Sequence, residues 1–213
     1  MRRARLPVPL RHRPYAGQVS GRTAFLLVVA ATVGQLLLAI LAPDLPQFEG
    51  KAFGARLVFY PLMMLLPPAI WVAVARRRGM TAPVPWWGFT LIAAPFLVDV
   101  TGNTLDLYDS IWWWDDANHF GNWLLLCLGI GLLVERGGVS PRWALALLIT
   151  GIGSLLAILW ELGEWYTFIR NGTELATAYE DTLGDEALGS LGGLAAALLL
   201  VWWRTRHPTA LAE

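Results

Sequence analysis

Long stretches without Asp, Glu, Lys or Arg most constrain what this chain can fold into. They lie at roughly 23–43, 57–75, 79–98, 117–134, 143–160 and 187–203. Each is close to the ~17–25 residues that an α-helix needs to cross the ~30 Å hydrocarbon core of a bilayer. The sequence therefore predicts an all-α fold, a polytopic integral membrane protein with about six transmembrane helices.

The composition favours lipid over water as the solvent of these helices. Hydrophobic residues make up 56% of the chain, only 15% of it is charged, and it holds 12 Trp. A soluble bundle would repeat polar residues at every helical turn, whereas the run 143–160 is apolar around most of its circumference. The first run follows an Arg-rich start, as in a signal peptide, but it is longer than a typical signal-peptide core, so we expect an uncleaved first helix.

Basic residues predict the orientation. Only Lys51, Arg56 and Arg170 lie on one side of the expected bundle, and the other 13 of the 16 basic residues lie on the opposite side. By the positive-inside rule, both termini are expected in the cytoplasm. The expected organisation is a basic tail (1–22), a six-helix transmembrane domain (23–203) and a short second tail (204–213).

Acidic residues have the reverse distribution, and 14 of the 16 fall at the expected outer helix ends. Topology does not require this, because carboxylates contribute little to orientation. We therefore expect a polar site on the outward-facing side, where the segments 99–118 and 161–186 hold most of the polar residues. Cys127 is the only cysteine, which excludes an internal disulfide and a cluster of thiolate ligands.

The first candidate motif is Asp115-Asp116-x-x-His119, at the start of the fourth run. His119 follows Asp116 by three residues and Asp115 by four, so on a helix at least one carboxylate shares its face. Such a pair can bind a divalent metal or orient an imidazole for proton transfer. It can equally be a hydrogen-bonded group at the membrane interface, where we also expect the preceding tryptophans.

The second motif, Glu161-x-x-Glu164, ends the fifth run. Like charges at this spacing repel, so a shared proton, a cation or Arg170 should offset them. Ionisable groups inside a span usually face the protein interior or a water-filled cavity, and a functional role is the default interpretation.

The third motif enters the last run. Asp181, Asp185, Gly189 and Gly193 are spaced by four residues, so glycines that allow close helix packing continue the carboxylate face. This spacing predicts that both aspartates point into the bundle.

Together the three motifs can converge into one site that takes a divalent metal. One imidazole among carboxylates suits Mg²⁺, Mn²⁺, Ca²⁺ or non-haem iron better than structural zinc. The expected metal ligands are Asp116, His119, Glu161 and Asp181, the expected catalytic groups are Glu161, Glu164 and Asp185, and the further polar residues are Asp99, Asn103, Asp109 and Asp115.

The pattern resembles the VanZ-like group and the related YjdF-type bacterial inner-membrane proteins. The resemblance runs from about Asp99 to Gly193 and rests on the three motifs above. Asp115 and Asp185 stand where VanZ-like proteins tend to have Lys and Asn, so the YjdF-type branch fits better. The resemblance implies a compact helical domain in the bacterial inner membrane with a polar outer site, and it implies no established reaction.

Three functions remain open from the sequence. One is metal-dependent chemistry on a lipid-linked or cell-envelope substrate. A second is a proton- or cation-coupled transporter, which the apolar cytoplasmic halves of the helices disfavour. The third is a non-catalytic accessory protein of the membrane. A phosphate-binding loop and a nucleotide fingerprint are absent from the sequence.

Overall fold

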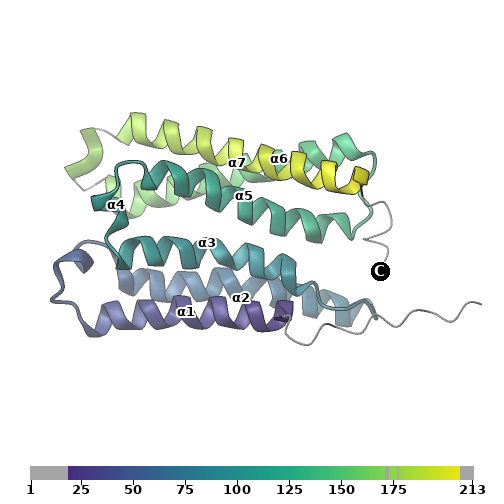
Figure 1. The fold of residues 1–213 in the computed structure, drawn as a ribbon, viewed down its shortest axis with the longest axis horizontal. Helices are drawn as coiled ribbons and strands as arrows, with labels where there is room; N and C mark the ends of the chain where they lie inside the picture. The colour runs from purple at the N-terminus through teal and green to yellow at the C-terminus, as the bar shows by residue number, and fades with distance from the viewer. Residues whose placement is uncertain (1–18, 171–172, 177, 207–213) are drawn as a thin grey trace, which may run out of the picture.

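The computed structural model describes residues 19–170, 173–176 and 178–206, and this part of the chain is helical without any strand. The long helices lie side by side in an up-and-down bundle (Figure 1). Most of the expected basic tail and the end of the second tail, residues 1–18 and 207–213, fall outside the described residues. The α-helices are α1 (Gly21–Leu41), α2 (Phe53–Arg77), α3 (Trp86–Thr104), α4 (Leu107–Ser110), α5 (Trp114–Glu135), α6 (Arg142–Glu164) and α7 (Ala178–Arg206), and the short helical turns are η1 (Pro46–Phe48), η2 (Trp165–Ile169) and η3 (Thr173–Ala176).

Within the described residues, five helices are long and apolar enough to cross a membrane: α1, α2, α5, α6 and α7. The expected polytopic, all-α architecture is therefore supported. The count of six is not confirmed, because α3 is not among the five. α3 has only 19 residues, and its last two turns hold Asp99, Thr101 and Asn103, so it lacks the long apolar stretch of the other five, although it lies alongside them in the bundle (Figure 1).

Several helices extend beyond the uncharged runs. α5 begins at Trp114, α6 continues to Glu164 and α7 begins at Ala178, so the three acidic motifs lie on helices. Glu161 and Asp185 are buried against other helices at one end of the bundle, whereas Asp116 and Asp181 are exposed there. By contrast, α3 starts seven residues later than its uncharged run, at Trp86, since Pro83 and Pro85 precede it and proline disfavours helix at the residue before it.

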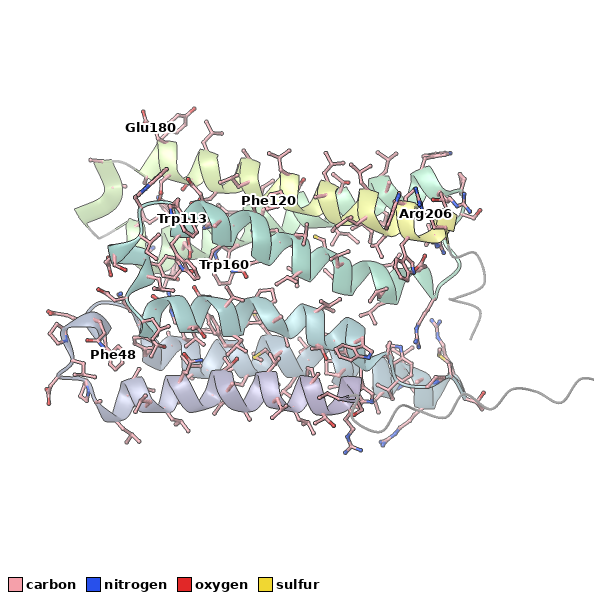
Figure 2. The ribbon with its side chains drawn as sticks, viewed as in Figure 1. Phe48, Trp113, Phe120, Trp160, Glu180 and Arg206 are labelled. Carbon is pink, nitrogen blue, oxygen red and sulfur yellow. The ribbon has the colours of Figure 1, made fainter. Side chains whose placement is uncertain are left out.

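The two ends of the bundle carry opposite charge. Figure 2 shows Glu180 and Trp113 at one end and Arg206 at the other. We call the first the acidic end and the second the basic end. The first residues of α1 and the last residues of α7 both lie at the basic end (Figure 1).

Glycines allow α5 to approach two neighbouring helices closely. A Cβ atom at Gly192 on α7 would lie 2.4 Å from the carbonyl oxygen of Phe120 on α5. A Cβ at Gly129 on α5 would lie 2.6 Å from the carbonyl oxygen of Gly88 on α3. The bundle is therefore built on close backbone contacts of the kind that membrane helices use in place of a hydrophobic driving force.

An ion pair joins α5 and α7 at the basic end. Arg204 Nε contacts Glu135 Oε1, and the Glu135 side chain is only 3% exposed. A buried carboxylate requires such a partner, because an isolated charge in a low-dielectric interior is strongly destabilising. Arg204 thus explains how Glu135, unlike most of the acidic residues, is accommodated at the basic end.

We expect Gly129→Val to destabilise the protein by about 1–3 kcal/mol, because the added side chain forces α3 and α5 apart. The measurement is thermal unfolding of the detergent-purified protein, followed by circular dichroism. Gly151→Val is the matched control, since a Cβ at Gly151 meets nothing within 4 Å. Equal melting temperatures for both variants would show that the α3–α5 contact is not close-packed.

Candidate functional site

His119 lies at the centre of a group of carboxylates at the acidic end. Its Nε2 atom is 3.5 Å from Asp115 Oδ1 and 3.5 Å from Asp185 Oδ1. Its Nδ1 atom is 3.8 Å from Glu161 Oε1. We call these four residues the His119 group. Their side chains come from α5, α6 and α7, so the group exists only when the three helices are packed together.

The His119 group is mostly buried but opens at one point. The side chains of His119, Glu161 and Asp185 are 10%, 4% and 6% exposed, whereas that of Asp115 is 42% exposed. His119 Nδ1 is buried and has no hydrogen-bond partner within the part of the chain that the structure describes. An unpaired buried polar atom is costly, and in a native protein it calls for an explanation.

The arrangement can hold a metal ion. One donor atom each from Asp115, His119 and Asp185 lie within 4.8 Å of one another. Two ligand atoms at about 2.0–2.2 Å from the same ion are about 3.0–3.5 Å apart, which is close to the separations at Nε2. The third carboxylate, Glu161, faces the other ring nitrogen, where the partners of metal-bound histidines usually lie.

Glu164 connects this group to the rest of the acidic end. It is half-buried one turn beyond Glu161 and lies within electrostatic range of His119, Asp99 and Arg56. Arg170 does not offset its charge in the described residues, since its guanidinium instead lies 3.7 Å from the ring centre of Tyr166.

A second cluster surrounds Asp99, at the end of α3. The carboxylate accepts hydrogen bonds from Arg56 at 2.6 Å, Tyr108 at 2.9 Å and Asn103 at 3.2 Å, and from the hydroxyl of Tyr60. The side chains of Arg56 and Asp99 are each 15% exposed. These four donors satisfy the hydrogen-bonding capacity of the carboxylate. Because the donors come from α2, α3 and α4, this Asp99 cluster links the three helices.

Tyr108 contributes to the Asp99 cluster as a hydrogen-bond donor. Burial, together with the negative charge of Asp99, raises the pKa of its hydroxyl far above the ordinary value. This shift favours the protonated hydroxyl, which donates to Asp99.

Lys51 forms the outer edge of this region. It contacts Asp106 at 2.8 Å and Asp109 at 2.6 Å. Burial opposes its charge, but the two carboxylates outweigh that effect and raise the pKa of Lys51. The bond from Lys51 in turn lowers the pKa of Asp106. This pair of contacts links the η1–α2 segment to α4.

The structure distributes the residues singled out in the sequence among these clusters. Asp115, His119, Glu161 and Asp185 come together, whereas Asp116 and Asp181 are exposed and lie outside the group that could hold an ion. Asp99 and Asn103 belong to the Asp99 cluster, and Asp109 pairs with Lys51.

Sequence reasoning missed Arg56, Tyr60 and Tyr108 as members of a polar cluster. From the sequence, Arg56 contributes only to the predicted orientation. A usable signal existed, because Arg56 and Tyr60 are four residues apart at the start of α2 and share one face. An ionisable residue one turn inside a span needs a partner, and Asp99 lies at the same end of the neighbouring α3.

These features define the class of protein: a helical, multi-pass membrane protein with polar clusters at one end of its bundle. The chain belongs to the family described as "Predicted membrane protein (DUF2238)", whose members it matches over residues 23–206. No curated protein and no solved structure matches it. The family match supports the expected membrane protein, and the resemblance to VanZ-like and YjdF-type proteins is not confirmed.

We expect Asp99→Asn to lower stability by about 3 kcal/mol or more, because it leaves the buried Arg56 guanidinium without its counter-charge. Thermal unfolding in detergent measures the change. Asp109→Asn is the control: its side chain is 66% exposed, and exposed ion pairs contribute about 0–1 kcal/mol. The structural role of the Asp99 cluster would be refuted if both substitutions had the same small effect.

Proposed function

We propose that the protein is a metal-dependent membrane enzyme that acts on a lipid-linked or cell-envelope substrate. The observation that carries the proposal is the position of His119. Its Nε2 atom lies between the carboxylates of Asp115 and Asp185, and its buried Nδ1 atom lacks a hydrogen-bond partner in the described residues. A divalent ion bound to Nε2, Asp115 and Asp185 would replace two overlong contacts with coordination bonds.

Glu161 then acts as the positioning carboxylate of the histidine. A metal-bound imidazole usually donates its second N–H to a carboxylate, which fixes the ring and raises its basicity as a ligand. Glu161 is 3.8 Å from Nδ1 and almost fully buried, so a small adjustment brings it into hydrogen-bond distance. In this proposal Asp115 and Asp185 replace Asp116 and Asp181 in the ligand set predicted from the sequence.

The ion would supply a polarised water molecule as the nucleophile. Glu164 is the general base of the proposal, because it is half-buried beside the group and carries no ion pair in the described part of the chain. Three protein ligands leave coordination positions for water and substrate, as in catalytic rather than structural metal sites.

The surroundings favour an amphipathic substrate. Asp115 opens the group toward the acidic end, and exposed aromatic side chains gather on the neighbouring turns. Trp112 is 90% exposed, and Trp113, Trp165 and Tyr166 are also exposed. Tryptophan and tyrosine at this level of a bundle lie at the membrane interface, where the headgroup of a lipid-linked molecule is found.

Metal analysis of the purified protein tests the ligand set. After dialysis without chelator, about one equivalent of a divalent metal is expected in the wild type. His119→Ala and Asp185→Asn should lose it. Glu161→Gln should bind it about 10–100-fold more weakly, because only the positioning carboxylate is removed. Inductively coupled plasma mass spectrometry and titration with Mn²⁺ give these quantities.

Asp116→Asn is the matched control, since Asp116 neighbours Asp115 but lies outside the group. Loss of metal in this variant but not in Asp185→Asn would favour the ligands predicted from the sequence. A folded wild type without metal would overturn the proposal and favour a proton relay through the same side chains. A metal-loaded wild type that alters no species in an envelope lipid extract would favour the accessory role.

The proposed topology is six spans in the bacterial inner membrane, with both termini in the cytoplasm. The support is the concentration of arginine at the basic end and the presence of the first and last helix ends at that same end (Figure 1). In this topology α3 is the third span along the chain and brings the count from five to six. The Asp99 cluster lies at its outer end.

A green fluorescent protein fused after the C-terminus is expected to fluoresce in a bacterial host, because it matures in the cytoplasm and not after export through the general secretory route. Alkaline phosphatase at the same position should be inactive. The reversed pattern would place the basic end outside, and a reporter inserted at Met80, between α2 and α3, provides an independent reading of the same face.

A further inference from the structure

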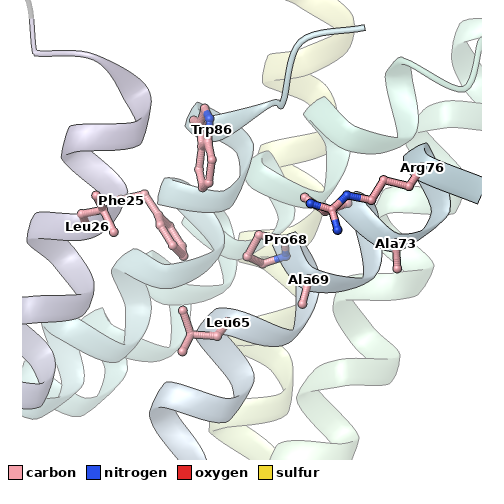
Figure 3. Close-up of a pocket in the computed structure, with 9 residues that line it drawn as sticks. Phe25, Leu26, Leu65, Pro68, Ala69, Ala73, Arg76 and Trp86 are labelled. Atoms are coloured by element: carbon pink, nitrogen blue, oxygen red, sulfur yellow. The ribbon is translucent and has the colours of Figure 1, made fainter. Parts of the chain in front are cut away.

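An apolar groove lies at the basic end, away from the His119 group and the Asp99 cluster. It has a volume of about 480 Å³ and lies between α1, α2 and the start of α3 (Figure 3). Its wall on α2 is made largely of small side chains. The lining residues are Phe25, Leu26, Leu65, Pro68, Ala69, Val72, Ala73, Arg76 and Trp86. Arg76 is the one charged residue among them.

The length of the groove matches one leaflet of a bilayer. On α2 it runs from Leu65 to Arg76, which are eleven residues apart. At ~1.5 Å per residue this is about 16 Å, roughly half of the ~30 Å hydrocarbon core. The groove therefore begins near the middle of the membrane and ends at headgroup level, where Arg76 lies.

The floor and the rim of the groove differ in a way that suits a lipid. Phe25 and Pro68 are buried, whereas Leu26 and Leu65 are 52% and 46% exposed. The groove thus opens sideways onto the bilayer, where acyl chains are the surrounding molecules. The apolar side chains that line the groove make no hydrogen bonds to water. An acyl chain can therefore fill the groove without breaking a hydrogen bond.

The rim carries positive charge. Figure 3 shows the Arg76 side chain extending toward the side of the groove formed by Pro68 and Trp86. The guanidinium of Arg22 lies 6.0 Å from the Trp86 ring centre at the same end. Arginine binds phosphate oxygens through two parallel N–H donors, and basic side chains at headgroup level attract anionic lipids.

We propose that this groove is a binding site for an anionic diacyl phospholipid of the leaflet at the basic end. One acyl chain lies along Leu65, Ala69 and Ala73, and Arg76 binds the phosphate. The site is independent of the proposed enzymatic function, since it shares no residue with the His119 group. A lipid bound here fills the space between α2, α1 and the start of α3, and so stabilises their packing along half of the bundle.

The experiment compares the retention of two lipids that differ only in the headgroup. Full-length protein is purified in detergent, exposed to dioleoyl phosphatidylglycerol or dioleoyl phosphatidylcholine, and analysed by native mass spectrometry. The wild type is expected to retain phosphatidylglycerol in preference. Arg76→Gln should weaken that binding about fivefold, the equivalent of the ~1 kcal/mol that one basic side chain contributes near an anionic lipid.

Two further variants separate the site from general attraction to charge. Arg77 lies on the same helical turn as Arg76 but does not line the groove. Arg77→Gln should therefore change lipid binding less than twofold. Ala69→Phe fills the groove and should reduce the retention of both lipids. Circular dichroism confirms that each variant is folded, which is expected because all three positions are exposed.

Equal retention of the two lipids by the wild type would overturn the proposal. Equal losses in Arg76→Gln and Arg77→Gln would overturn it as well, because the attraction would then be diffuse. Unchanged retention in Ala69→Phe would exclude an acyl chain in the groove.

Discussion

An ionised side chain at membrane depth is stable only when another helix supplies its counter-charge, and much of this bundle follows from that constraint. Arg56 on α2 meets Asp99 on α3, and Arg204 on α7 meets Glu135 on α5. Each pair lies near an end of the bundle, where partial contact with water lowers the cost of desolvation. Apolar side chains and glycines make the contacts between these ends.

The class of fold could be predicted from hydropathy because lipid imposes a simple rule: a span must be long, apolar and helical. The rule is less informative for α3. Its polar residues face partners within the bundle, as when Gln35 donates to Thr101 and Asn103 donates to Asp99. A hydropathy average counts such residues as exposed to lipid, so it undervalues a helix whose polar groups are satisfied inside.

The candidate site was predicted in part. The three motifs do come together around His119, since each lies at the end of a helix that reaches the acidic end. Which of Asp115 and Asp116 faces His119 depends on the rotation of α5, because neighbouring residues on a helix differ by about 100° in direction. Sequence spacing alone leaves that rotation open, and the packing of α7 on α5 through Gly192 determines it in the structure. Asp181 and Asp185 are four residues apart and share one face of α7, and Asp181 is exposed because it lies in the first turn of that helix, one turn nearer its end.

The close packing of α7 also has a consequence for the rigidity of the His119 group. Gly189 and Gly192 follow Asp185 by one and two turns, and a Cβ at either would collide with Trp123 or the backbone of α5. Packing this close restricts the sliding and rolling of α7, so we expect most of the entropy of ordering Asp185 beside His119 to be lost when the chain folds rather than when a ligand arrives. In the proposed metal site, a bound ion would meet donors already in position, and discrimination between ions of different radius would depend on a spacing that the backbone itself maintains.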